Sequence, residues 1–204
     1  MKAKPRIFEV ARSKPRFDLG RWQMAKVCDH TSVGLLLSYQ NNNDWQLRFL
    51  MIERHNYPQA IALPAGHCDG DDFYKAIRRE SKEEVGIDLG NLNLNFVARI
   101  DNPCKRQDGS HHIWGIFEGY FYSGTVAAGS DAKRFFWATL DELRKFSQRT
   151  EFFMKKYSVD WQDVGKLTKA IFGDPQNPQV DPDWQKEMGL EPVWYYILKK
   201  LMYI

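Results

Sequence analysis

The sequence predicts a layered α/β fold, and two observations support this prediction. Segments rich in β-branched, leucine and aromatic residues are mixed with segments that repeat apolar residues at the helical period. Turn-forming residues separate them, as in the cluster at residues 41–44. We therefore expect strands packed against helices around one core, without an internal repeat.

The expected elements follow in order along the chain. Strands are expected at residues 31–39, 45–53, 60–65, 92–100, 111–122 and 133–139. A helix is expected at residues 72–85, with an aspartate as its N-cap. Residues 101–110 form a polar loop, and residues 140–143 open a short helix.

The last part of the chain is expected to be helical. Candidate helices cover residues 151–157, 161–172 and 191–202, and a proline-rich linker or extended cover occupies residues 173–183. We divide the chain into an N-terminal arm (1–25), a main domain (26–147) and a helical C-terminal extension packed on the domain (148–204). The extension is expected to be a helical layer or the contact of a homodimer; the alternative is that it walls the substrate pocket.

Composition fits a cytoplasmic enzyme. A chain of 204 residues with 43% hydrophobic residues can bury one sizeable core. The net charge of +3 suits an anionic small-molecule substrate and does not demand nucleic acid. Three scattered cysteines do not form a disulfide framework. We find no signal peptide and no stretch apolar enough to span a membrane.

The helix at residues 72–85 carries carboxylates where apolar residues are expected. Phe73 and Ile77 define an apolar stripe, Glu80 and Glu84 continue it, and Glu83 lies at its edge. Inward-facing carboxylates at this spacing repel one another and lose hydration, so they need a cation. Oxygen ligands suit Mg²⁺ or Mn²⁺ rather than zinc. The competing interpretation is a solvated acidic face.

The same segment resembles the Nudix box, G-x5-E-x7-R-E-U-x-E-E-x-G-U, in which U is apolar. Residues 79–87 match its second half, except that Ser81 replaces an apolar residue. In the first half Gly66 lies one residue too close to Glu80, and Asp71 stands in the place of the early glutamate. The resemblance covers about residues 31–143 and implies a Nudix-like α/β/α sandwich with a mixed sheet.

The resemblance also implies the chemistry. The reaction would be hydrolysis of a pyrophosphate bond in a nucleoside diphosphate linked to another group. The cofactor would be Mg²⁺, with Mn²⁺ as the alternative. Glu80, Glu83, Glu84 and the Gly66 carbonyl would ligate the metal. Arg79 would orient a glutamate, so Glu84, Glu83 and Arg79 form the expected catalytic set.

The general base and the roles of two aspartates stay open. Glu84, Asp131 and Glu118 are the candidate bases, although Glu118 also fits an outward-facing strand residue. Asp71 or Asp72 would cap the helix or pair with Arg79.

Substrate-binding residues are expected in and after the polar loop. Arg106 can hold a phosphate, and His111 or His112 can donate to one or act as a base. Trp114 can stack on a nucleobase. For each of them, a position in solvent or in the core is the alternative.

A zinc site is the weaker interpretation. Its possible ligands are Cys28, His30, His67, Cys68, Cys104, His111 and His112. Their spacing contains no C-x2-C pair, so we expect the cysteines to be small apolar core residues.

Three functions compete on the sequence alone. The first is a Mg²⁺-dependent pyrophosphohydrolase acting on a nucleoside triphosphate, nucleotide sugar or dinucleotide. The second is a non-catalytic module of the same fold that binds a nucleotide and regulates another process. The third is an enzyme that removes pyrophosphate from RNA 5′ ends, which needs a basic groove lined with aromatic residues.

Overall fold

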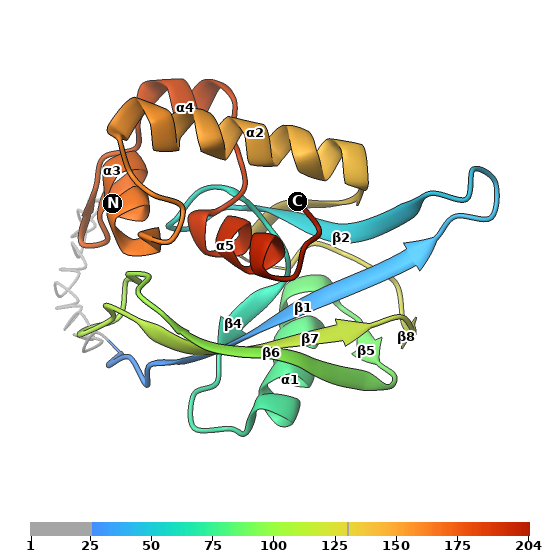
Figure 1. Ribbon diagram of the computed structural model, residues 1–204. Helices are drawn as coiled ribbons and strands as arrows, with labels where there is room; N and C mark the ends of the chain where they lie inside the picture. The colour runs from blue at the N-terminus through green and yellow to red at the C-terminus, as the bar shows by residue number, and fades with distance from the viewer. Residues whose placement is uncertain (1–25, 130) are drawn as a thin grey trace, which may run out of the picture.

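The computed structural model describes residues 26–129 and 131–204, so the expected N-terminal arm lies outside the described residues. The chain forms a mixed sheet with helices on both sides, which confirms the predicted α/β/α sandwich (Figure 1). Helix α1 lies on one side of the sheet, and the C-terminal helices lie on the other. None of the helices in the described part of the chain has the length and apolar character needed to cross a membrane.

Seven strands form the main sheet, and the described chain has two further two-stranded sheets. The main sheet contains β1 (Thr31–Gln40), β2 (Leu47–Arg54), β3 (Ile61–Ala62), β4 (Ala65–His67), β6 (Leu92–Ile100), β7 (His112–Gly119) and β9 (Ala132–Thr139). The small sheets pair β5 (Asp88–Leu89) with β8 (Tyr122–Ser123) and β10 (Gly173–Asp174) with β11 (Asn177–Pro178). The helices are α1 (Phe73–Val85), α2 (Leu140–Tyr157), α3 (Val164–Phe172), α4 (Pro182–Lys186) and α5 (Pro192–Lys200).

Strand β1 organises the sheet because it has different neighbours along its length. Its start pairs antiparallel with β4, with Ser32 opposite His67, and its end pairs antiparallel with β2, with Ser38 opposite Phe49. On its other edge β1 runs parallel to β7. Strand β4, which leads into the loop before α1, therefore lies across β1 from the start of β7.

Two glycines show how closely both helical layers approach the sheet. A Cβ atom at Gly34 of β1 would lie 2.4 Å from the Trp194 ring of α5. A Cβ atom at Gly115 of β7 would lie 2.7 Å from the Phe73 ring of α1. Gly115 pairs with Val33, the neighbour of Gly34, so alternation along the strands turns these two positions to opposite faces. The absence of side chains therefore admits a large aromatic ring on each face.

Several expected elements differ in the structure. The short helix at 140–143 and the helix at 151–157 are one continuous helix, α2, because no glycine or proline interrupts the intervening residues. A capping box between Thr139 and Glu142 starts this helix, which runs through the expected boundary between residues 147 and 148. The expected strand at 60–65 divides into β3 and β4 around Pro64, which has no amide hydrogen to donate. The expected linker at 173–183 contains the β10–β11 hairpin and the start of α4.

Candidate functional site

Helix α1 forms as expected, and its first residues separate the roles of the two aspartates. The Asp72 carboxylate accepts a hydrogen bond from the Lys75 amide at 2.9 Å and caps the helix. Asp71 instead pairs with Arg79, whose Nε lies 3.2 Å from Oδ2. The helix ends at Gly86, whose φ of 75° requires the left-handed conformation that glycine adopts readily.

Glu84 is the most deeply buried carboxylate of α1. Its side chain is among the buried residues of the chain, and Oε2 accepts a hydrogen bond from the Ala65 amide at 2.7 Å. Burial raises the pKa of Glu84 to about 8, although the positive charge of Arg54 acts to lower it. A buried carboxylate with this shift needs a nearby positive charge to stay ionised at neutral pH.

Glu80 lies directly against the backbone of Gly66. A Cβ atom at Gly66 would lie 2.0 Å from the Glu80 carboxylate, so no larger residue fits without displacing Glu80. Burial also raises the pKa of Glu80, and the charge of Arg79 opposes this shift. The loop before α1 is one residue shorter than in the Nudix pattern, but it still places Gly66 against Glu80.

Arg79 holds the acidic side chains around it in place. Its Nη1 donates to Glu80 Oε1 at 2.5 Å and lies 3.3 Å from Glu83 Oε2. Its Nη2 donates to the backbone carbonyl of His67 at 2.8 Å. Charge-assisted bonds of this kind are shorter and stronger than neutral ones, so Arg79 fixes the carboxylates relative to the loop.

Ser81, which departs from the family pattern, fits the core. It is completely buried, and its hydroxyl donates to the Ile77 carbonyl at 2.7 Å. This bond within the helix satisfies the hydroxyl, so a serine can replace the usual apolar residue.

The three glutamates line a cavity of about 530 Å³. Other residues that line it include Arg54, Gly66, His67, Asp69, Arg79, Asn102, Arg106, His112, Trp114, Asp131 and Glu191. Glu84 is buried and Glu80 is partly buried, so their negative charges are poorly hydrated and repel each other. Oxygen donors of this type fit a hard divalent cation such as Mg²⁺ or Mn²⁺.

The structure separates the two candidate bases outside α1. Asp131 lines the cavity, and its Oδ1 accepts a hydrogen bond from Asn56 Nδ2 at 2.9 Å. Glu118 is not among the cavity residues and accepts hydrogen bonds from the hydroxyls of Tyr120 and Tyr203, at 2.9 and 2.6 Å. Glu118 therefore agrees with the alternative expectation of a strand residue outside the site of the glutamates.

The candidate substrate-binding residues occupy different environments. Arg106 forms a two-pronged ion pair with Asp69 and lines both this cavity and a second one. His112 and Trp114 line the cavity of the glutamates, and both contact the side chain of Asn102. His111 lies in the second cavity.

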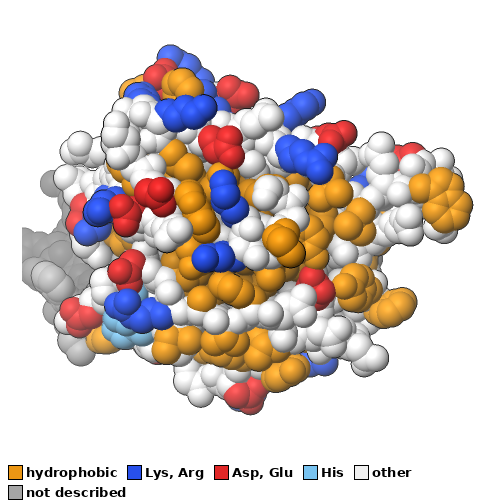
Figure 2. All heavy atoms as spheres, in the orientation of Figure 1, with side chains coloured by type: hydrophobic (Ala, Val, Ile, Leu, Met, Phe, Trp, Pro, Cys, Tyr) orange, Lys and Arg blue, Asp and Glu red, His pale blue; other side chains and the backbone are white. Residues whose placement is uncertain are grey.

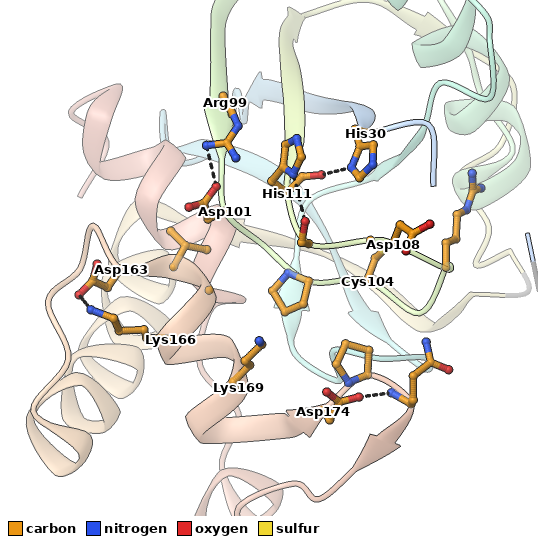
Figure 3. A pocket seen from close by; sticks show the side chains of 18 of the residues that line it. His30, Arg99, Asp101, Cys104, Asp108, His111, Asp163, Lys166, Lys169 and Asp174 are labelled. Atoms are coloured by element: carbon orange, nitrogen blue, oxygen red, sulfur yellow. Dashed lines mark hydrogen bonds and ion pairs between the residues drawn. The ribbon is translucent and has the colours of Figure 1, made fainter. Parts of the chain in front are cut away.

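The second cavity has a volume of about 880 Å³ and lies between the polar loop and the C-terminal extension (Figure 3). His111 stacks on His30 there, with ring centroids 4.4 Å apart. Lys166 and Lys169 reach its wall from α3. The extension therefore packs on the core and also forms part of this second cavity.

Sequence reasoning missed an ion pair between the domain and the extension. Arg54 Nε lies 3.8 Å from Glu191 Oε2, and both residues line the cavity of the glutamates. Burial raises the pKa of Glu191, although the positive charge of Arg54 acts to lower it. Arg54 ends an apolar strand, and an arginine at that position is a signal that could have been used.

The structure also gathers four thiol and imidazole side chains that are distant in sequence. The ligand atoms of Cys28, His67, Cys104 and His112 all lie within 4.8 Å of one another. Burial lowers the pKa of His67 to about 4 and that of His112 to about 3, so both rings are neutral at pH 7. The expectation of an apolar core cysteine suits Cys68, which is 1% exposed and lies outside this cluster.

Comparison with known proteins agrees with this geometry. Residues 29–160 match the NUDIX domain, so the chain belongs to the Nudix family. The protein is a Nudix hydrolase, an enzyme class that acts on pyrophosphate bonds. No curated protein matches the sequence.

Solved structures of other Nudix proteins are similar to this chain. A MutT NUDIX hydrolase from Burkholderia pseudomallei is 24% identical, with 55% of this chain and 85% of that chain covered and a TM-score of 0.45. An Ap4A hydrolase from C. elegans is 20% identical, with 63% and 96% covered and a TM-score of 0.44. The NUDIX domain of Shewanella oneidensis NrtR, complexed with ADP ribose, is 16% identical, with 63% and 88% covered and a TM-score of 0.44.

Proposed function

We propose that the protein is a Mg²⁺-dependent pyrophosphohydrolase that cleaves a nucleoside diphosphate-linked substrate by attack of water at phosphorus. The observation that carries the proposal is the convergence of Glu80, Glu83 and Glu84 on one cavity, with Glu80 against Gly66. Arg79 bonds to two of these carboxylates and orients them. Glu80, Glu83, Glu84 and the Gly66 backbone would hold the cation.

Different residues of the cavity would have different roles in the reaction. A bound Mg²⁺ or Mn²⁺ would neutralise charge on the diphosphate and lower the pKa of the attacking water. Glu84 or Asp131 would accept the proton of that water, since both line the cavity. Arg54, another residue of the cavity wall, would contact the anionic substrate.

A small nucleotide suits the site better than RNA. The cavity of about 530 Å³ is within the range of small-molecule sites, and Trp114 in its wall offers an aromatic surface. On the face drawn in Figure 2, Lys and Arg side chains alternate with Asp and Glu and form no continuous basic surface. A nucleoside triphosphate, nucleotide sugar or dinucleotide is therefore the proposed substrate class.

A hydrolysis panel tests this proposal. Nucleoside triphosphates, ADP-ribose, other nucleotide sugars, dinucleoside polyphosphates and 5′-triphosphate RNA are incubated with the unaltered protein and with Glu83→Gln, with and without Mg²⁺. A phosphatase added to the assay reveals monophosphate products. We expect Mg²⁺-dependent hydrolysis of one nucleotide class, reduced by at least about 100-fold in the variant. Tight binding without turnover would instead favour the regulatory module.

A second variant distinguishes the two candidate bases. Asp131→Asn keeps the shape of the side chain and its position beside Asn56 but cannot accept a proton. If Asp131 is the base, kcat falls by about 100-fold or more while the Mg²⁺ concentration for half-maximal activity stays unchanged. An unchanged kcat would leave Glu84 as the base.

A further inference from the structure

The cluster of Cys28, His67, Cys104 and His112 has no part in the proposed hydrolysis, although all of its members except Cys28 line the cavity of the glutamates. Its four members come from the segment before β1, from β4, from the polar loop and from β7. Cys28 and His112 are 5% and 1% exposed, and the other two are half-buried. Thiols and imidazoles are the ligands that zinc prefers in proteins.

Three distances within the cluster are close to the edges of a zinc tetrahedron, and all four ligand atoms lie within 4.8 Å of one another. Zinc bonds of about 2.3 Å to sulfur and about 2.0–2.1 Å to nitrogen give edges of about 3.8 Å between sulfurs and about 3.3 Å between nitrogens. In the structure Cys28 Sγ lies 3.8 Å from Cys104 Sγ. His67 Nε2 lies 3.1 Å from His112 Nε2, and His112 Nε2 lies 3.2 Å from Cys28 Sγ.

Asn102 determines the tautomer of His112, and therefore which ring nitrogen presents a lone pair to the cluster. Asn102 Oδ1 accepts a hydrogen bond from Trp114 Nε1 at 3.0 Å and lies 3.1 Å from His112 Nδ1. An acceptor oxygen at this place requires the proton on Nδ1, so Nε2 carries the lone pair. A partner of this kind behind an imidazole is typical of metal ligands.

Hydrogen bonding alone does not explain the arrangement around His112. The lone pair on Nε2 can accept one hydrogen bond, yet both Cys28 Sγ and His67 Nε2 lie within 3.2 Å of it. A cation at the centre would accept electron pairs from all four side chains at once. Gly109 leaves room for this, because a Cβ atom there would lie 2.2 Å from Cys104 Sγ.

We infer that Cys28, His67, Cys104 and His112 bind one Zn²⁺ ion in a closed tetrahedral site that stabilises the fold. Four protein ligands fill the coordination sphere, so the site has a structural role and does not activate water. His67 directly follows Gly66, which contacts Glu80. The zinc would therefore anchor the loop before α1 to the polar loop and to β7, and would fix the position of Gly66.

Metal analysis of the full chain, purified without a histidine tag or chelators, tests the inference. We expect about one zinc per chain, released when a mercurial reagent modifies the thiols. Cys104→Ser should lose most of this zinc. Cys68→Ser is the control, because Cys68 directly follows His67 in the chain but lies outside the cluster, and it should keep the zinc.

Two further measurements make the test independent of folding and of hydrolysis. Cobalt added to the metal-free, unaltered chain should give the visible absorption of a tetrahedral site with two thiolates, without any substitution. Glu83→Gln should retain the zinc even if it loses all hydrolytic activity. A folded chain without zinc, a Cys28–Cys104 disulfide, or zinc retained in Cys104→Ser would each overturn the inference.

Discussion

Gly66 is the residue on which the position of Glu80 depends most directly. Its lack of a side chain lets the Glu80 carboxylate lie against the backbone of the loop. Gly66→Ala should displace this carboxylate, and a misplacement of about 1 Å in a catalytic site can cost about 100-fold in rate. We expect a loss of kcat of that order, measured by steady-state hydrolysis of the best substrate in the panel.

Gly70→Ala is the control for that substitution. Gly70 has a φ of 86° and no atom within 4 Å of the added Cβ, so its replacement strains the backbone without touching Glu80. The control should lose about 1 kcal/mol of stability and keep its kcat. Equal activity of both variants would show that Gly66 does not position Glu80.

Asp71 pairs with the Lys75 and Arg79 side chains, whereas Asp72 caps the helix, so the two neighbours should respond differently to substitution. Asp72→Ala removes the N-cap of α1 and should lower the free energy of unfolding by about 1 kcal/mol, with activity retained. Asp71→Asn weakens the pairing with Arg79 and should lower kcat with a smaller effect on stability. Chemical denaturation and kinetics on both variants check this; the opposite pattern would exchange the two roles.

At the scale of secondary-structure elements, Asp181 joins α2 to α4. Its carboxylate accepts hydrogen bonds from Lys156 Nζ at 2.7 Å, from the Tyr157 hydroxyl, and from the Asp183 amide at 2.7 Å. Burial opposes ionisation of Asp181, but these bonds outweigh it and lower its pKa. The ionised form therefore stabilises the folded chain.

The lowered pKa predicts a pH dependence of stability. The contribution of Asp181 should be fully present above its unfolded pKa of about 3.9 and should disappear as the pH falls through the lower folded value. Asp181→Asn should cost about 1 kcal/mol at pH 7, and the difference should shrink in acid. Thermal unfolding at several pH values measures this difference in stability. Asp163→Asn, at a side chain that is 46% exposed, is the control. A difference that grows in acid would contradict the assignment.

Elements with a clear period or cap were predictable, and those that depend on distant partners were not. The apolar stripe, the aspartate cap and Gly86 fixed the limits of α1 to within one residue. The continuity of α2 was not predicted; in the structure the central polar residues Ser147 and Thr150 bond back to carbonyls within the helix.

At the scale of the whole molecule, the C-terminal extension completes the core. Trp194 of α5 is fully buried and packs on Gly34 of the central strand. Trp194→Ala should lower the free energy of unfolding by about 3–5 kcal/mol, because it leaves a cavity between layers. Trp45→Ala, at a site that is 72% exposed, should change it by less than about 0.5 kcal/mol. Similar values from urea denaturation would contradict the role of the extension.

The local pattern of one helix predicted the glutamates of the site, whereas the tertiary fold determined its surroundings. Glu80, Glu83 and Glu84 share one helical face, so spacing alone indicated their convergence. Arg54 and Glu191 meet because the extension folds back over the domain. The four members of the Cys/His cluster lie on different segments, and their spacing therefore resembled no zinc pattern.

The central claim is that the carboxylates of α1 perform Mg²⁺-dependent pyrophosphate hydrolysis. The most direct measurement compares kcat of Glu84→Gln with that of Glu118→Gln on one substrate from the panel. Glutamine can still accept the Ala65 amide bond, and Glu118 bonds to two tyrosines away from the cavity. We predict a loss of at least about 100-fold for Glu84→Gln and nearly full activity for Glu118→Gln. Nearly full activity in Glu84→Gln would contradict the claim.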